Sequence, residues 1–131
     1  MAKLKHEQRP SGQRDDYRFF RNEDTGKAFK ALHEPRLAAD GTPAVWLSVA
    51  PVDPDGHAEL NLAGEPDTLA IVHTFTSAEL ADPQFSAEGR VATVLANLVE
   101  TKERELKGRA QIKALSDLWK SAKPLPIAKQ S

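Results

Sequence analysis

The fold is decided by the stretch AVWLSVAPV, which occupies residues 44–52. Its apolar residues recur with a period of two, so that Val45, Leu47 and Val49 fall on one side of an extended chain. The residues between them fall on the other side, because successive side chains of a strand point in opposite directions. The stretch therefore predicts a strand over 44–51 with one face turned toward a core.

The same alternation continues outward on both sides of this strand. Upstream, Gly26 follows polar turn residues, and its freedom to adopt a positive φ suits a hairpin. We expect Pro35 to end the return strand of that hairpin. Because the connections are short, strands that follow one another in sequence are expected to pair as an antiparallel meander. The predicted strands cover residues 17–22, 27–33, 44–51, 57–62 and 68–76.

Beyond the last predicted strand, the apolar spacing changes to the period of a helix. Thr76 and Glu79 have the spacing of a capping box, which opens a short helix that Pro83 ends. Ser86 is a second helix start, and apolar residues at helical spacing follow it from Val91 onward. The pattern therefore predicts two or three helices after the sheet.

The helical region has two interpretations at Gly108. A glycine after a lysine is typical of a helix end, which would give helices over 86–107 and 109–122 with a bend between them. Against this, three glutamates between residues 100 and 105 each have a basic residue four positions later, and each such pair stabilises a continuous helix by about 0.2–0.5 kcal/mol. We favour one long helix, with a kink possible at Gly108. Residues 86–107 are expected to cover one face of the sheet, and residues 109–122 either fold back or project. The predicted fold class is α+β: an antiparallel meander of four to five strands followed by two or three C-terminal helices, one long helix packing on the sheet.

Charge divides the chain into three blocks. Residues 1–33 carry eight Lys/Arg against five Asp/Glu, and residues 101–131 carry eight against three, whereas residues 34–100 carry two against eleven. This basic–acidic–basic layout is a physical hint of an electrostatic partner. The predicted organisation is a flexible basic arm over 1–16, a single α+β domain over 17–123 and a flexible tail over 124–131.

The composition excludes several classes of chemistry. The chain has no cysteine, which excludes disulfides, thiol catalysis and thiolate metal sites. Its first residues lack the apolar segment of a secretory signal, and no apolar run approaches the roughly 20 residues of a membrane helix. We therefore expect a cytoplasmic protein with no membrane partner.

No motif in the sequence points to catalysis, a cofactor or a metal. Asp53, Asp55, His57 and Glu59 form the densest group of potential ligands, but the segment lacks the glycine and glutamate positions of an EF-hand loop. We interpret this group as a polar hairpin turn. His73 lies on the apolar side of a strand pattern, where a histidine is more often a core residue than a catalyst. A small hydrolase or metal-dependent enzyme using His57 or His73 is therefore the weakest hypothesis, and we assign no catalytic residue, metal or cofactor.

The first hypothesis is a small non-enzymatic accessory protein that binds nucleic acid. The hairpin over 17–33 mixes aromatic and basic side chains, as do surfaces that stack bases and neutralise phosphates. The basic flanks at the two ends of the chain support the same interpretation. The opposing interpretation places Phe19 and Phe29 in the core and the cations on a solvated face. The predicted contact residues are Arg18, Phe20, Arg21, Lys27 and Lys30.

The second hypothesis is a protein–protein adaptor or assembly factor that acts through the C-terminal amphipathic helix. Ile112, Leu115, Leu118 and Trp119 recur at helical spacing among lysines. If this part of the helix projects beyond the sheet, its apolar side is exposed and requires a partner helix or a second copy of the chain. The predicted partner-binding residues are Ile112, Leu115 and Trp119.

Overall fold

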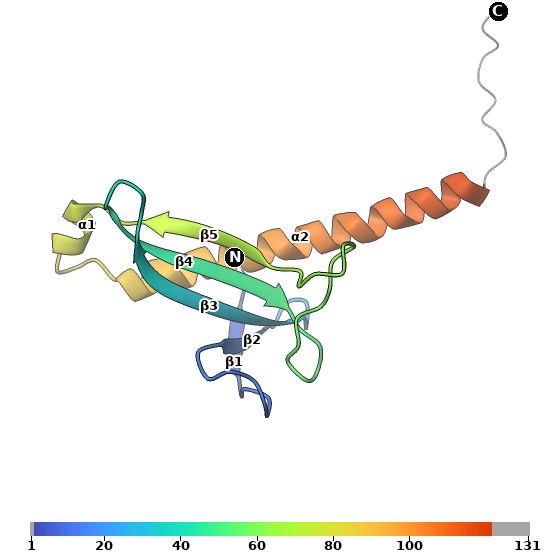
Figure 1. The fold of residues 1–131 in the computed structure, drawn as a ribbon, viewed down its shortest axis with the longest axis horizontal. Coiled ribbons are helices and arrows are strands. Elements are labelled where there is room, and N and C mark those ends of the chain that lie inside the picture. Colours follow the sequence, from blue (N-terminus) through green and yellow to red (C-terminus); the bar gives the residue numbers. More distant parts are fainter. Residues whose placement is uncertain (1, 122–131) are drawn as a thin grey trace, which may run out of the picture.

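The protein folds as a five-stranded antiparallel sheet with one long helix across one face, and the computed structural model describes residues 2–121 (Figure 1). The strands pair in chain order, so the sheet is a meander. The predicted α+β fold with a long packing helix is confirmed. The elements are β1 Leu4–Glu7, β2 Arg18–Asn22, β3 Ala28–Leu37, β4 Pro43–Pro51, β5 Leu69–Thr74, α1 Ser77–Ala81 and α2 Ala87–Ser121.

The sheet has two faces that the register of β4 defines. Leu47 of β4 lies opposite His33 of β3 and Ile71 of β5, and these side chains share the face that is turned toward α2. We call this the inner face. The outer face carries the alternate residues, among them Trp46 of β4 and Val72 of β5, which also lie opposite each other.

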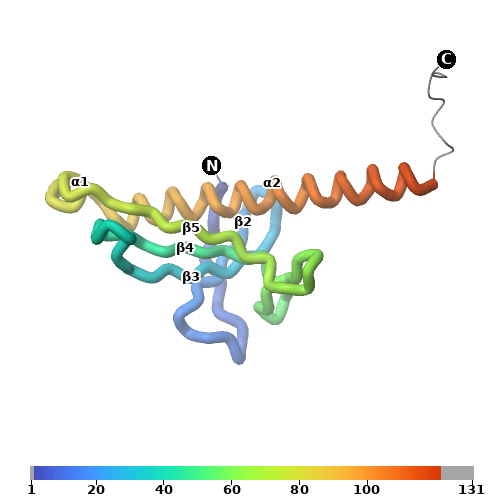
Figure 2. The backbone as a smooth tube through the Cα atoms, turned by 45° about the horizontal axis from the view of Figure 1, so that its top comes forward, coloured from blue at the N-terminus to red at the C-terminus, as the bar shows by residue number. Residues whose placement is uncertain are grey.

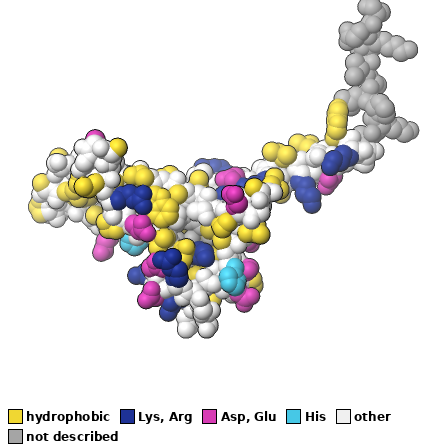
Figure 3. All heavy atoms as spheres, in the orientation of Figure 1, with side chains coloured by type: hydrophobic (Ala, Val, Ile, Leu, Met, Phe, Trp, Pro, Cys, Tyr) yellow, Lys and Arg dark blue, Asp and Glu magenta, His cyan; other side chains and the backbone are white. Residues whose placement is uncertain are grey.

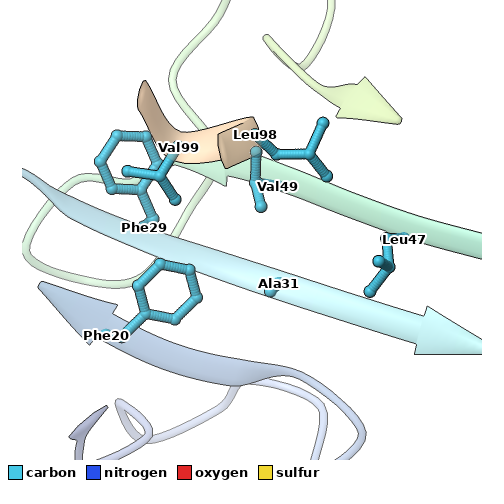
Figure 4. Packing of buried hydrophobic residues seen from close by; sticks show 7 residues of the cluster. All are labelled: Phe20, Phe29, Ala31, Leu47, Val49, Leu98 and Val99. Carbon is cyan, nitrogen blue, oxygen red and sulfur yellow. The ribbon is translucent and has the colours of Figure 1, made fainter. Parts of the chain in front are cut away.

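The core lies between the inner face and the middle of α2 (Figure 4). Phe20 and Phe29 stack across β2 and β3 with their ring centroids 6.2 Å apart. Each large apolar side chain buried here stabilises the fold by about 1.5–3 kcal/mol, so the cluster is what holds α2 on the sheet. Its members are Phe20, Phe29, Ala31, Leu47, Val49, Leu98 and Val99.

Helix α2 is continuous over 35 residues, which confirms the long helix and rejects a helix end at Gly108. At about 1.5 Å per residue it is roughly 52 Å long, and it extends well past the sheet (Figures 1 and 2). Its buried residues all lie in the middle: Ala96, Leu98, Val99 and Lys102.

Both predicted helix starts are confirmed. Thr76 caps α1, and its side chain and that of Glu79 form a reciprocal capping box with the backbone. The hydroxyl of Ser86 accepts a hydrogen bond from the backbone N–H of Gly89 at 3.0 Å, which satisfies one of the free amides at the start of α2.

The predicted strand over 57–62 is wrong. Asp53 and Asn61 each accept two backbone N–H groups through a side-chain oxygen, and these local bonds fold the segment into successive tight turns. Only isolated bridges occur there, and Leu62 is 92% exposed. Alternation in this segment therefore does not reflect a buried face.

Within the arm predicted over 1–16, residues 4–7 form strand β1 against β2. This strand is short and charged, as edge strands commonly are, and the ion pair between Glu7 and Arg21 joins it to β2 at 3.0 Å. The predicted tail over 124–131 lies outside the described residues.

The prediction that Pro35 ends its strand is also wrong, because β3 continues to Leu37. Strand β2 pairs with β3 only as far as Ala31. Beyond that point β3 has one open side, and a proline is tolerated in a strand whose N–H side faces solvent.

Candidate partner-binding site

The residues predicted to contact nucleic acid do not form one surface. Arg18 and Phe20 belong to the inner face, opposite Ala31 and Phe29 of β3. Arg21 is one residue further along β2 and therefore belongs to the outer face. Lys30 also lies on the outer face, opposite Phe19, and Lys27 precedes β3 in the turn. The period of the strand thus separates the set into two groups on opposite sides of the sheet.

Phe20, one of the residues predicted to contact nucleic acid, is 2% exposed and belongs to the core. A base can stack only on an aromatic face that solvent reaches. Phe19 is also buried, at 5% exposure. The opposing interpretation, which assigned Phe19 and Phe29 to the core, is confirmed.

All four predicted cations already have partners inside the fold, Arg18 through a hydrogen bond to the backbone carbonyl of Asp15. Arg21 is paired with Glu7, and the ammonium of Lys27 lies 2.8 Å from the carboxylate of Glu59. The ammonium of Lys30 lies 4.5 Å from the ring centroid of Tyr17, and burial lowers the pKa of this lysine. A phosphate would have to compete with these contacts.

A polar cavity of about 260 Å³ lies where β1, the β2–β3 turn and the loop after β4 meet. Arg21 and Lys27 line it, but so do Glu7 and Asp53. The lining is therefore balanced in charge, and an anion entering the cavity would gain little net attraction.

The group formed by Asp53, Asp55 and His57 is a tight turn held by the side chain of Asp53. Their potential ligand atoms lie within 4.8 Å of one another, and all three side chains are at least partly exposed. One carboxylate oxygen of Asp53 is used as acceptor by the backbone N–H groups of Asp55 and His57. The interpretation of this group as turn chemistry agrees with these bonds.

His73 is half-buried and makes structural contacts. Its ring packs edge-on against Phe75 with centroids 5.1 Å apart, and one ring nitrogen lies 3.5 Å from the guanidinium of Arg90. Arg90 in turn forms an ion pair with Glu79 at 2.6 Å. These contacts join β5, α1 and the start of α2.

A buried ion cluster lies where α2 leaves the sheet. The side chain of Lys102 is 2% exposed, and its ammonium lies 2.8 Å from one carboxylate oxygen of Asp67. The guanidinium of Arg109 lies 3.0 Å from the other oxygen of Asp67 and also pairs with Glu105. Glu105 completes the group by contacting Lys102 at 3.3 Å. Two cations and two anions thus join the loop before β5 to two successive turns of α2.

The ion cluster keeps Asp67 charged. Burial by itself would raise the pKa of this carboxyl, but the hydrogen bonds from Arg109 and Lys102 outweigh burial and lower the pKa. Because the buried charges are paired, the cluster fixes the helix to the loop without leaving an uncompensated ion.

A second anchor fixes the same part of α2 on its other side. The carboxylate of Glu103 accepts hydrogen bonds from the side-chain amide of Asn22 at 3.1 Å and from the hydroxyl of Thr25 at 2.7 Å. The β2–β3 turn and the loop before β5 therefore hold α2 between them at residues 102–109. The direction in which the rest of the helix projects is set by these contacts.

Beyond these anchors, every residue of α2 from 110 to 121 is exposed. Four large apolar side chains are nevertheless present, and each is about two-thirds exposed. Figure 3 shows hydrophobic and basic side chains next to each other on this projecting end. The apolar residues are Ile112 at 67%, Leu115 at 64%, Leu118 at 64% and Trp119 at 66% exposure.

The three predicted partner-binding residues share one side of the projecting helix with Gly108. Gly108, Ile112, Leu115 and Trp119 are spaced by four, three and four positions, which places them on one side of an α-helix. A Cβ added at Gly108 would meet no atom within 4 Å, so no packing inside the fold requires a glycine there. We call Gly108–Ser121 the tip, and Ile112, Leu115, Leu118 and Trp119 its stripe.

Comparison with protein-family models, with curated proteins and with solved structures finds no match for this chain. Among residues 2–121, no helix combines the length and the apolar character needed to cross a bilayer. Function is therefore inferred from the geometry of this chain.

Proposed function

We propose that this protein is a non-enzymatic protein-interaction module, in which the sheet domain holds a rigid helix whose tip binds an apolar surface of a protein partner. The observation that carries the proposal is the stripe: four large apolar side chains, each about two-thirds exposed, on a helical segment that the fold does not cover. Single exposed apolar residues are common on protein surfaces, but a contiguous group of this kind marks interaction sites.

The stripe is large enough to contribute useful binding energy. Four such side chains at this exposure present on the order of 450 Å² of apolar surface, which is in the range of the functional patches found on monomeric proteins. Burial of that area is worth roughly 10 kcal/mol before the loss of translational and rotational freedom is subtracted. The expected result is reversible binding rather than a permanent complex.

The anchors at residues 102–109 support a binding role because they orient the tip before a partner arrives. A disordered segment would have to be ordered on binding, at a cost in conformational entropy. The tip is already helical, so less of its burial energy is lost to ordering. The exposed aromatic ring of Trp119 is also the kind of residue that contributes most at interfaces.

Nucleic-acid binding is the weaker proposal for the same structure. The predicted contact set is divided between two faces of the sheet, and one of its members is buried. All four of its cations have partners within the fold. The basic residues at the two ends of the sequence remain a reason to test it.

The test of the proposed function is the double variant Leu115→Ala/Trp119→Ala. We expect it to lose association with the protein partner, or with itself, while circular dichroism and unfolding midpoint stay as in the unmodified protein. The control is Leu60→Ala, which removes a loop leucine that is 64% exposed, as Leu115 is, and it should leave association intact.

Two results would contradict the proposal. One is unfolding of the double variant, which would place the stripe in a core; the other is unchanged association. A titration with a single-stranded oligonucleotide at several salt concentrations accompanies the test. Tight binding that weakens steeply with salt and persists in the double variant would favour nucleic acid instead.

A further inference from the structure

The inner face of the sheet is wider than the helix that covers it. Five strands spaced by about 4.8 Å make a sheet roughly 24 Å wide, whereas a helix with its side chains is about 10 Å across. The contacts of α2 with the sheet are concentrated on β4 and β5. The inner face of β1, β2 and β3 therefore extends beyond the helix on one side.

Beside the first half of α2 lies an apolar groove, and Phe20, Ala31 and Leu47 at its floor are at most 6% exposed. A cavity of about 410 Å³ has Phe20, Ala31 and Leu47 on its sheet side and Val91 and Leu95 on its helix side. A second cavity of about 290 Å³ continues it toward β1. The two cavities share His6, Phe20, Ala92 and Leu95.

Polar side chains at the edges of the groove are few and of both signs. Arg18 and His33 line the groove from the sheet, and Glu88 lines it from the first turn of α2. The backbone carbonyl of Asp15 accepts a hydrogen bond from Arg18 at 3.2 Å. The groove is thus an apolar channel with a balanced rim, which suits the apolar side of an amphipathic helix.

We propose that the groove binds the tip of α2 from a second copy of this chain, so that the stripe of one copy completes the inner layer of the next. The inference rests on the proposed function, because it names the partner of the same tip. In such a contact the inserted tip lies beside the first half of the other copy's α2 and covers β1 to β3.

The tip cannot reach the groove of its own copy. The groove lies beside residues 87–95, at the start of α2, whereas the tip begins at residue 108 and points away from the sheet (Figure 2). Helix α2 is continuous between them, and the anchors at residues 102–109 fix its direction. The contact must therefore form between two copies.

Charge favours a tip-to-groove contact over a tip-to-tip contact. The tip carries three basic residues against one acid, so two tips brought together would repel each other. Residues 2–107, the rest of the described chain, carry thirteen basic residues against eighteen acids. Approach of a basic tip to the domain of another copy is therefore attractive at long range.

The area predicts a weak contact. The stripe offers on the order of 450 Å² and the groove less, since Phe20, Ala31 and Leu47 on its sheet side are at most 6% exposed, so the interface stays below the roughly 1,200 Å² at which specific interfaces begin. Because the stripe and the groove are different surfaces, the contact is heterologous and leaves a free groove and a free tip on the end copies. The expected assemblies grow with concentration, unless a ring closes.

The test is a complementation experiment followed by sedimentation velocity. The tip variant Leu115→Ala/Trp119→Ala keeps the groove, and the groove variant Ala92→Glu keeps the tip while it places a charge in both cavities. Ala92 is exposed on α2, so the substitution preserves a good helix former. Each variant alone should be monomeric, and an equimolar mixture should form a 1:1 heterodimer that grows no further.

The control is Asn97→Glu, which places the same charge at an exposed position of α2 outside the groove and should assemble like the unmodified protein.

A mixture that stays monomeric while the unmodified protein associates would overturn the tip-to-groove contact, as would normal assembly of Ala92→Glu. If the unmodified protein is monomeric but the tip variant loses a different partner, the proposed function stands and this inference fails. If the tip variant assembles like the unmodified protein, both fail.

Discussion

The middle and the end of α2 are parts of one helix with opposite environments. Leu98 in the middle is 6% exposed and belongs to the core, whereas Leu115 near the end is 64% exposed. Their surroundings in sequence are similar, since both belong to runs of apolar residues at helical spacing. The difference arises because the sheet ends near the loop that contains Asp67, whereas α2 continues beyond that loop to Ser121.

An apolar side of a helix therefore indicates a surface that has to be covered. It does not indicate whether the same chain or another molecule covers it. For Leu98 the partner is the sheet, and for Leu115 the chain provides none in the described residues. The ion cluster at residues 102–109 is the boundary between the two situations. Substitutions before this boundary should therefore lower the stability of the fold, whereas substitutions beyond it should affect association.

The largest effect is expected at the boundary itself. Asp67→Ala removes the carboxylate that pairs with Lys102 and Arg109, and it leaves the buried ammonium with Glu105 alone. Breaking a buried ion pair from one side costs about 3–5 kcal/mol, so we expect a fall of about 3 kcal/mol in the free energy of unfolding. Urea denaturation measures it, with the exposed Glu65→Ala from the same loop as control.

Acid should reproduce part of this loss in the unmodified protein. Burial raises the pKa of Asp67, but the hydrogen bonds from Arg109 and Lys102 outweigh burial and lower the pKa in the folded state. The charged form of Asp67 therefore stabilises the fold at pH values above the ordinary carboxyl pKa. That contribution is lost as the pH falls from about 4 through the folded-state pKa. The difference in unfolding free energy between the unmodified protein and Asp67→Asn should therefore shrink below pH 4; a difference that stays constant would contradict the assignment.

The next largest effect separates the two leucines. Leu98→Ala should lower the free energy of unfolding by about 2–4 kcal/mol, because it removes core contacts and leaves a cavity. Leu115→Ala should change it by less than about 0.5 kcal/mol at concentrations where the protein is dissociated. Equal destabilisation by the two substitutions would show that the stripe is covered within a single copy.

The smallest effect is a gain in stability. Gly108→Ala should raise the free energy of unfolding by about 0.5–1 kcal/mol, since alanine has the lower entropic cost in a helix and its Cβ would meet open space. Thermal unfolding of dilute protein is the measurement. Destabilisation would reveal a contact at Gly108 that the fold described above does not contain.

Much of the fold could be predicted from local patterns. The alternation of Val45, Leu47 and Val49 predicted the central strand and its buried face, and the capping box at Thr76 predicted the start of α1. The same period of two could also have separated Arg18 from Arg21, because residues three apart in a strand point to opposite faces. The predicted nucleic-acid surface ignored this.

The remaining features depend on distant partners. Lys102 and Asp67 are 35 positions apart, and the sequence contains no sign that the lysine is buried. Strand β1 is mostly polar, and it pairs with β2 while Leu4 packs against the core. The alternation over residues 57–62 is overridden by side-chain bonds to the backbone at Asp53 and Asn61. From the sequence, Ile112, Leu115 and Trp119 were expected to be exposed only if the helix projects beyond the sheet. The direction of α2 in the structure shows that it does.

The order of elements along the chain also sets an order in time. All five strands end by Thr74, but the residues that cover their inner face, Ala96 to Lys102, come later. Domains emerge from synthesis N-terminal end first at about 5–20 residues per second, so the strands are made a few seconds before the part of α2 that covers their apolar face. During that interval nascent chains are open to mispairing with one another or to capture by a chaperone, and the middle of α2 ends the exposure.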